Sequence, residues 1–246
     1  MKGKNVMKNK ISGKIVALLL TLIIVATSGM PLYAKETGDK ANSFRYENGQ
    51  SIAKAVPFST LSPNAWKKID GKYYSGDGSV IEGAVAKGID VSHHQGTVDW
   101  KKAKEDGVEF AIIRCGFGMN QTKQDDAQWF NNVKGCEENN IPYGVYLYSY
   151  ADTVKKAQSE AEHVLRLIKG HTLAYPVYYD IEEKAVLNKL TAEQLGKIAA
   201  TFVNKVKAEG YQTGIYSNKS NFETFLTDSQ FSQWNKWVAP VSYTHL

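Results

Sequence analysis

The sequence predicts an α/β fold in which helices cover a parallel β-sheet. Short strands rich in apolar and aromatic residues are expected at 87–92, 109–115, 143–150, 175–182 and 212–218. Stretches with helical periodicity separate them, and each ends at a glycine or an asparagine pair. Because this alternation is typical of parallel sheets, a (β/α) barrel and an open doubly wound sheet both fit. No Gly-x-Gly-x-x-Gly follows the first strand, so a dinucleotide-binding fold has no support.

The clearest helix is expected over residues 191–209. Thr191 is predicted to cap its N-terminus, and Gln194 to complete a capping box. Gly210 follows the last turn, as is common at helix ends. One face of this helix is apolar and consists of Leu195, Ile198, Ala199, Phe202, Val203 and Val206. An earlier helix is expected to begin at Asp99, a good N-cap residue.

Composition and charge narrow the class of protein. The chain has 246 residues, of which 43% are hydrophobic and 22% charged, so it is expected to be globular rather than disordered. The net charge of +5 comes entirely from the first 34 residues, which contain five lysines and no acid. The remainder is formally neutral, which argues against nucleic-acid binding through bulk charge.

The ends of the chain suggest export. Residues 1–34 are typical of a signal peptide: lysines are followed by an apolar run at 15–26 and a small-residue cleavage point after Ala34. That run is too short for an ordinary membrane span, although an uncleaved anchor is the alternative. The protein is therefore expected to be secreted and to act in the cell wall or outside the cell, with no integral membrane segment after cleavage.

Three further segments are expected before and around the main domain. Residues 35–65 are predicted to form a polar linker. Residues 66–85 are interpreted as a small aromatic hairpin with a glycine turn, which packs on the main domain or, less simply, represents one wall-anchoring repeat. Cys115 and Cys136 could pair in an exported protein, but their expected positions on a strand end and along the next helix favour two buried free thiols.

Polar side chains are expected to gather at the carboxyl ends of the strands, where barrels and open parallel sheets keep their active sites. Two-residue alternation places one polar set on a common face: Asp90 and Ser92; Arg114; Tyr146, Tyr148 and Tyr150; Tyr178, Asp180 and Glu182; Tyr216 and Asn218. Glu183 is predicted to point the other way. The alternative is that Asp180 and Glu182 are loop acids beyond the end of their strand.

Two carboxyls in different surroundings are what glycoside hydrolysis requires. One must stay protonated to release the leaving oxygen, while another is ionised and stabilises the oxocarbenium-like centre. A neighbouring carboxylate raises the pKa of its partner and keeps it protonated near neutral pH. Tyrosines offer flat apolar faces and hydroxyls to sugar rings. The convergence of Asp90, Asp180 and Glu182 among tyrosines therefore favours a glycosidase.

Five ordered segments resemble the strand motifs of glycoside hydrolase family 25: residues 87–100, 110–116, 141–150, 175–182 and 214–218. These enzymes are bacterial and phage lysozymes that cut the β-1,4 bond after N-acetylmuramic acid in peptidoglycan. The resemblance covers residues 86–239 and implies a barrel of five β/α units closed by three further strands. It implies a monomeric muramidase that acts on glycan strands without metal or organic cofactor.

The resemblance also implies roles for individual residues. Glu182 would be the proton donor. Asp180 would stabilise the reacting centre or orient the substrate acetamido group, and Asp90 would line the same site. The expected sugar contacts are Tyr148, Tyr150, Tyr178, Tyr216 and Asn218.

The sequence departs from the family pattern in two places. Residues 114–118 are closer to the cell-wall autolysin branch than to members with a Lys-x-Ser/Thr-Glu-Gly stretch. Residues 240–246 match none of the last strands of the family, so we expect an incomplete barrel over 86–239, a truncated chain and a foreign tail at 240–246. Such an open barrel would leave two strand edges unpaired, and an inactive truncated chain is the alternative to an active enzyme.

Other activities remain as alternatives. A non-catalytic peptidoglycan-binding protein would keep the site but lose the chemistry. A chitinase-like glycosidase would be expected to carry a longer Asp-x-x-Asp-x-Asp-x-Glu run than the Asp180-Ile181-Glu182 found here. His93-His94 suggests a metal, but neither histidine has a partner at ligand spacing, and a position at the rim of the site is favoured.

Overall fold

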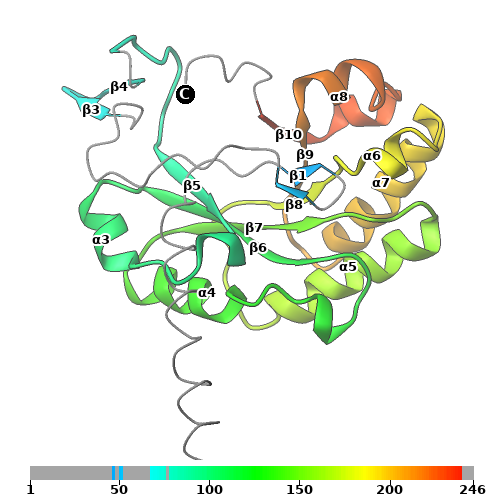
Figure 1. The fold of residues 1–246 in the computed structure, drawn as a ribbon, viewed down its shortest axis with the longest axis horizontal. Helices are drawn as coiled ribbons and strands as arrows, with labels where there is room; N and C mark the ends of the chain where they lie inside the picture. The colour runs from blue at the N-terminus through cyan, green and yellow to red at the C-terminus, as the bar shows by residue number, and fades with distance from the viewer. Residues whose placement is uncertain (1–45, 48–49, 52–66, 76–77, 240–246) are drawn as a thin grey trace, which may run out of the picture.

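The computed structural model describes residues 46–47, 50–51, 67–75 and 78–239. Its centre is one curled sheet of six parallel strands in the order β10-β9-β8-β7-β6-β5, with helices on its outer side (Figure 1). The strands are β5 (Gly88–Val91), β6 (Phe110–Phe117), β7 (Tyr143–Tyr148), β8 (Val177–Asp180), β9 (Thr213–Asn218) and β10 (Asn235–Ala239). The helices are α3 (Trp100–Glu105), α4 (Trp129–Glu138), α5 (Val154–Ile168), α6 (Lys184–Leu187), α7 (Ala192–Ala208) and α8 (Lys219–Thr224). Single 3-10 turns lie at His93–Gln95 (η1), Thr122–Gln124 (η2) and Ser229–Gln233 (η3).

The order of the strands decides between the two predicted architectures. Spatial order follows chain order from β5 to β10 without a reversal, whereas a doubly wound sheet reverses its order. The predicted α/β fold of barrel type is therefore confirmed, as a curled half-barrel of six strands. Among the described residues, β5 pairs only with β6 and β10 only with β9, so these two strands are the edges of the sheet.

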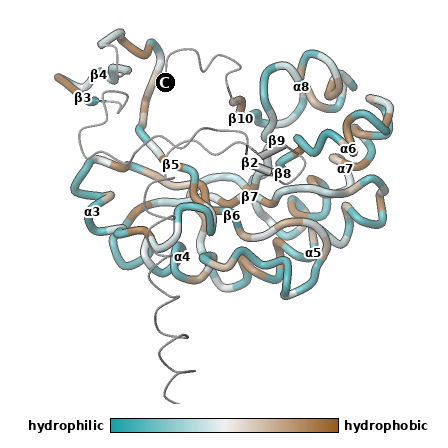
Figure 2. Tube along the Cα trace, in the orientation of Figure 1, coloured by the Kyte–Doolittle hydropathy of each residue, from teal (hydrophilic) through white to brown (hydrophobic). Residues whose placement is uncertain are grey.

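The hydrophobic core lies between the sheet and the helices. The Tyr179 ring of β8 stacks on Phe202 of α7, with ring centroids 3.9 Å apart. Apolar residues line β5 and β6, whereas hydrophilic and hydrophobic residues alternate along α5 (Figure 2). The predicted apolar face of α7 is buried, and its capping box is formed by Thr191 and Gln194. Asp99 caps α3 as predicted, accepting a hydrogen bond from the Lys102 amide.

Both cysteines belong to this core. Cys115 on β6 and Cys136 on α4 are fully buried and unpaired, which confirms the expectation of two free thiols. Burial raises the pKa of the Cys136 thiol to about 12 and raises that of Cys115 further. Neither sulfur is therefore poised as a nucleophile.

A small hairpin is attached at the amino-terminal edge of the sheet. β3 (Lys67–Ile69) and β4 (Lys72–Tyr74) are antiparallel, and the chain reverses between them at Asp70-Gly71, where both residues have positive φ. It turns again after Tyr74, which bridges to Val80. The buried Tyr73 hydroxyl and Lys68 both bind the Glu109 carboxylate, just before β6. These contacts join the hairpin to the segment just before β6.

Some predictions fall on parts of the chain outside the described residues. These are the signal peptide at 1–34, the tail at 240–246 and most of the linker at 35–65. Within that linker, β1 (Tyr46–Glu47) and β2 (Gln50–Ser51) form a short antiparallel pair. No helix in the described part of the chain is long and apolar enough to cross a membrane.

Candidate active site

The concave face of the sheet carries a continuous row of polar and aromatic side chains. Tyr148 of β7 lies opposite Asp180 of β8, Asp180 lies opposite Tyr216 of β9, and Tyr216 lies opposite Trp237 of β10. Cross-strand neighbours in a ladder share a face, so these four side chains point to the same side. Tyr179, the residue directly before Asp180 on β8, points the other way, into the core between the sheet and α7.

Three carboxyl groups converge on this face. Asp180 is 2% exposed, and burial together with the charge of Glu182 raises its pKa well above the ordinary value. Asp90 of β5 adds to this effect, while the Arg114 guanidinium opposes it. Asp90 itself stays accessible to solvent, but the surrounding protein displaces part of its hydration and raises its pKa too. The structure therefore brings together the three acids that the sequence singled out.

Asp180 is also incompletely paired. Its Oδ1 atom has no hydrogen-bond partner among the described residues, although it is buried. A buried oxygen without a partner is unfavourable by about 1–3 kcal/mol, and more when the group is charged. Such an atom on the concave face is suited to receive a hydrogen bond from a bound molecule.

Glu182 lies beyond the end of its strand, because β8 stops at Asp180 rather than at Glu182 as predicted. Two bonds to β9 nevertheless fix the peptide before it. The Ile181 amide donates to the Tyr216 carbonyl at 3.0 Å, and the Ser217 hydroxyl donates to the Ile181 carbonyl at 2.7 Å. The Asn221 side chain of α8 donates in turn to the Ser217 hydroxyl at 3.0 Å. Glu182 is thus a loop acid on a firmly held loop.

The prediction that Glu183 points away from the site is wrong. The end of β8 interrupts the alternation, and Glu183 is buried with its Oε2 accepting a hydrogen bond from the Tyr148 hydroxyl at 3.2 Å. Its other oxygen caps α6 by accepting from the Ala185 amide. Glu183 therefore orients the Tyr148 hydroxyl.

The predicted tyrosines occupy different parts of the face. Burial and the nearby carboxyls raise the pKa of Tyr148 and of Tyr216, so both hydroxyls remain protonated donors. Tyr150 follows the end of β7 and is 40% exposed, with its ring centroid 5.1 Å from that of Tyr148. Tyr178 lies two residues before Asp180, nearer the amino-terminal end of β8, and its ring contacts that of Trp237.

Two further observations complete the aromatic face. Trp237, which the sequence analysis did not propose as a site residue, contacts Tyr146, Tyr178 and Tyr216 at centroid distances of 5.9, 5.4 and 4.4 Å. Asn218 caps α8 through its side-chain oxygen, which accepts from the Asn221 amide at 2.9 Å. Its amide nitrogen can still donate to a sugar, and the second lone pair of the oxygen can still accept.

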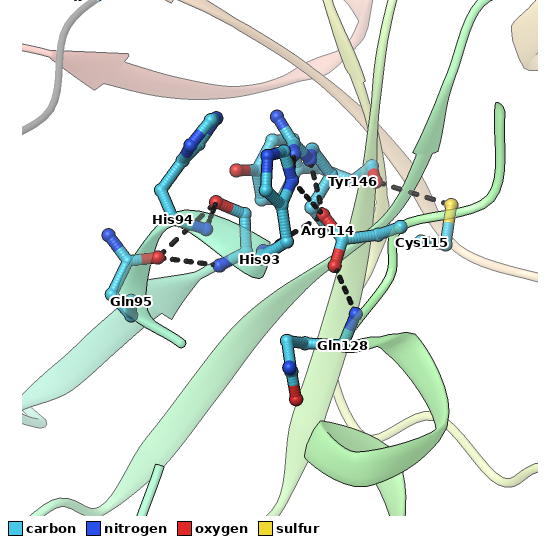
Figure 3. Close-up of polar contacts among 9 residues, drawn as sticks. His93, His94, Gln95, Arg114, Cys115, Gln128 and Tyr146 are labelled. Carbon is cyan, nitrogen blue, oxygen red and sulfur yellow. Dashed lines mark hydrogen bonds and ion pairs between the residues drawn. The ribbon is translucent and has the colours of Figure 1, made fainter. Parts of the chain in front are cut away.

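A buried ionic cluster supports the other side of the site (Figure 3). Arg114 of β6 donates from Nε to Asp126 Oδ2 at 2.7 Å, and its Nη2 contacts His93 Nδ1. The His93 amide donates to the same carboxylate, and the Gln128 amide donates to its other oxygen. Asp126 was not among the predicted site residues, and its one local feature is the Asx turn in which its side chain accepts from the Gln128 amide.

The histidines take part in this cluster rather than in a metal site. Burial, followed by the charge of Arg114, lowers the pKa of His94 to about 3, so it is neutral near pH 7. In the parts of the chain that the structure describes, no three His, Cys, Asp or Glu side chains gather in a way that could hold a metal ion.

Replacing Asp126 by asparagine is expected to destabilise the fold in a pH-dependent way. Burial alone would raise the pKa of Asp126, but His93 and Arg114 outweigh it and lower the value to about 2. Since its ordinary pKa is near 4, its stabilising contribution is present above about pH 4 and is lost towards pH 2. Asp126→Asn leaves Arg114 buried without a counter-charge, which costs about 3–5 kcal/mol at pH 7.

The measurement is urea unfolding of both proteins at pH 7 and pH 2.5. The control is Glu193→Gln, which removes an exposed ion pair with Lys197 and should change the free energy of unfolding by less than about 0.5 kcal/mol. An Asp126→Asn deficit that is equally large at both pH values would contradict the ionic role.

Comparison with known proteins places this geometry in a family. The sequence model of "Glycosyl hydrolases family 25" matches residues 89–245. A curated relative, the autolytic lysozyme of Clostridium acetobutylicum, is 28% identical over 153 residues, which are 62% of this chain and 44% of the relative.

Solved structures agree with this match. The modular autolysin LytC of Streptococcus pneumoniae is 30% identical and superposes with a TM-score of 0.61 over 77% of this chain and 45% of its own. A bacterial lysozyme of Streptomyces coelicolor shares the fold, with 23% identity and a TM-score of 0.55 over 64% of this chain and 75% of its own. The chain thus spans less than half the length of the autolytic lysozyme and of LytC. The family match alone extends over more than half of the chain, and the chain belongs to glycoside hydrolase family 25.

Proposed function

We propose that the protein is a lysozyme that hydrolyses the β-1,4 bond between N-acetylmuramic acid and N-acetylglucosamine in peptidoglycan. In this proposal Glu182 is the general acid, and Asp180 and Asp90 are the supporting carboxylates. The observation that carries it is the pairing of a buried and a half-buried carboxyl, Asp180 and Glu182, on a tyrosine-lined face. Membership in family 25 supports the same reaction class.

The carboxyl pair supplies the proton. Two neighbouring carboxyls, one of them buried, hold a proton to higher pH than either would alone, and this property belongs to the pair. Glu182 is the more accessible of the two and lies past the strand end. It therefore donates the shared proton to the glycosidic oxygen as the bond to the sugar C1 breaks.

The remaining groups stabilise the charge that develops at C1. Once the proton has left the pair, Asp180 and Asp90 carry negative charge toward the oxocarbenium-like sugar. The unpaired Oδ1 of Asp180 can accept a hydrogen bond from the acetamido N–H of N-acetylmuramic acid. The protonated hydroxyl of Tyr216 donates to a sugar oxygen, and the Tyr148 hydroxyl, whose proton is directed to Glu183, can accept from a sugar hydroxyl. Water then adds to C1, and its released proton restores the carboxyl pair.

The setting of the reaction follows from the substrate. Peptidoglycan lies outside the cytoplasmic membrane, so the lysine-rich leader at 1–34 would act as a secretion signal. LytC has been solved in complex with a synthetic peptidoglycan ligand. We place this protein at the cell wall as a monomer that binds glycan strands.

Replacing Glu182 by glutamine tests the proposal. The amide keeps the shape of the side chain but has no proton to donate, so the rate should fall by about 10²–10⁴-fold. The measurement is clearing of a gel that contains cell walls, together with release of reducing ends from purified peptidoglycan. Glu193→Gln, an exposed change on α7, is the matched control and should keep full activity.

The outcomes of this experiment are separable. An active Glu182→Gln enzyme would overturn the assigned role. A wild-type protein that sediments with cell walls but releases no reducing ends would overturn the catalytic proposal in favour of wall binding. Hydrolysis of chitin oligomers as fast as peptidoglycan would point instead to a chitinase-like enzyme.

Ser217 is expected to act as a positioning residue for Glu182. Ser217→Ala removes the donor to the Ile181 carbonyl and the acceptor for Asn221. It should cost about 1–3 kcal/mol of stability. It should also lower kcat about tenfold with little change in KM, since a small displacement of the acid affects the reaction step more than substrate binding.

Thr213→Val is the matched control on the same strand. The buried Thr213 hydroxyl has no hydrogen-bond partner among the described residues, so its loss should keep stability and kcat. A Ser217→Ala enzyme that is less stable but has unchanged kcat at 25 °C would show a structural role alone.

A further inference from the structure

The end of β6 contains an irregularity that redirects one side chain. Arg114 pairs with Tyr146, but the next pairs are Gly116 with Leu147 and Phe117 with Tyr148, so Cys115 is an extra residue in the ladder. Simple alternation from Arg114 would turn Phe117 outward. The bulge instead puts Phe117 on the concave face beside Tyr148, as bulges next to sites often do.

The glycines around Phe117 make this backbone possible. A Cβ atom on Gly116 would lie 2.7 Å from the Gln124 carbonyl oxygen and 2.7 Å from the His163 ring. Gly118 has a φ of +62°, which residues with side chains rarely adopt. The two glycines thus allow the backbone conformation in which Phe117, the one residue of this segment with a side chain, faces the site.

Phe117 belongs to a short aromatic ledge, which we define as Phe117, Tyr148 and Tyr150. The Phe117 ring meets the Tyr150 ring edge-on at a centroid distance of 6.3 Å, and the Tyr150 ring lies 5.1 Å from that of Tyr148. Phe117 is half-buried and Tyr150 is 40% exposed. The ledge therefore extends from Tyr148, which faces Asp180 and Glu182, outward to solvent.

Helix α5 holds both loops that carry the outer rings. Glu160 is fully buried and accepts hydrogen bonds from the Tyr150 amide at 2.9 Å and the Ser149 hydroxyl at 2.8 Å. His163, one turn later, contacts the Gly118 carbonyl at 3.0 Å. The backbone that carries these rings is held by the protein itself, which reduces the entropy lost on binding.

We propose that the aromatic ledge is a saccharide subsite that binds one pyranose ring of the glycan strand away from the broken bond. The proposal rests on the proposed function for its substrate. Phe117 has no polar atom, so it can bind a sugar only through the C–H face of the ring, while Tyr150 adds a hydroxyl beside it. A sugar ring, which has an apolar C–H face and hydroxyl groups around it, therefore fits this apolar surface with one hydroxyl at its edge.

The position of the ledge sets a length requirement. Phe117 lies on β6 and Asp180 on β8, two strand spacings or roughly 10 Å apart along the sheet. A sugar bound on Phe117 is then not one of the two sugars joined by the broken bond. Only glycans long enough to reach the ledge should benefit from it.

The experiment compares kcat/KM on peptide-free glycan fragments of increasing length. For Phe117→Ala we expect a loss of about tenfold on long fragments and no change on the shortest fragment that is cut. Phe117→Tyr keeps the ring and should retain at least half of the wild-type value on long fragments. Phe130→Ala, which removes a 67% exposed phenylalanine on α4, is the matched control and should change neither value.

Several results would overturn the subsite. One is an equal loss of kcat/KM at every length with unchanged thermal stability, and another is no loss at any length. A loss seen only on strands that still carry stem peptides would assign the ledge to the peptide instead. Where Phe117→Ala proves unstable by thermal unfolding, Phe117→Leu, which keeps the apolar volume but not the flat ring, decides in its place.

Failure of the proposed function gives a different pattern. A wild-type protein that cuts no glycan would overturn the lysozyme proposal, and sedimentation with purified glycan strands would then test the ledge by itself. Weaker sedimentation of Phe117→Ala than of Phe130→Ala supports the subsite. Equal sedimentation of the two variants overturns it.

Discussion

The cost of ionising Asp180, a buried carboxyl beside Glu182, is the constraint on which the rest of the site depends. Asp180 is buried at the end of β8, and the adjacent Glu182 charge adds to the cost of ionising it. The opposing positive charge comes from Arg114, which is itself neutralised largely by Asp126. The arrangement keeps a proton in the site at the expense of stability, as functional sites commonly do.

The scaffold holds this unfavourable pair through polar contacts made outside the row of carboxyls. On one side, Asn221 and Ser217 fix the peptide between the two acids. On the other, Glu160 and His163 of α5 fix the loops after β7 and β6. Each of these side chains is buried, so each bond is shielded from competing water. The rigid parts of the barrel thereby determine the geometry of its loops.

The sequence predicted the regular part of the fold and failed where regularity ends. Five strands and the capped α7 were predictable, because burial on both faces and helical spacing leave clear patterns. Alternation also placed Asp90 and Asp180 on the correct face. It failed for Glu183, which lies past a strand end, and could not reveal Phe117, which follows a bulge. Asp126 and Trp237 were missed because their contacts join segments distant in the chain.

The failures at Glu183 and Phe117 share one location, and the location has a physical reason. A parallel strand inside the sheet has its backbone groups paired on both sides, so its side chains must alternate. At the carboxyl edge the ladder stops, and local bonds such as those of Glu183 and Gly118 decide where each side chain points. The proposed glycan substrate would need carboxyls, hydroxyls and flat rings at different heights and angles, which strict alternation does not provide. The irregular edge of the sheet is therefore the part of the fold that could match the shape of such a substrate.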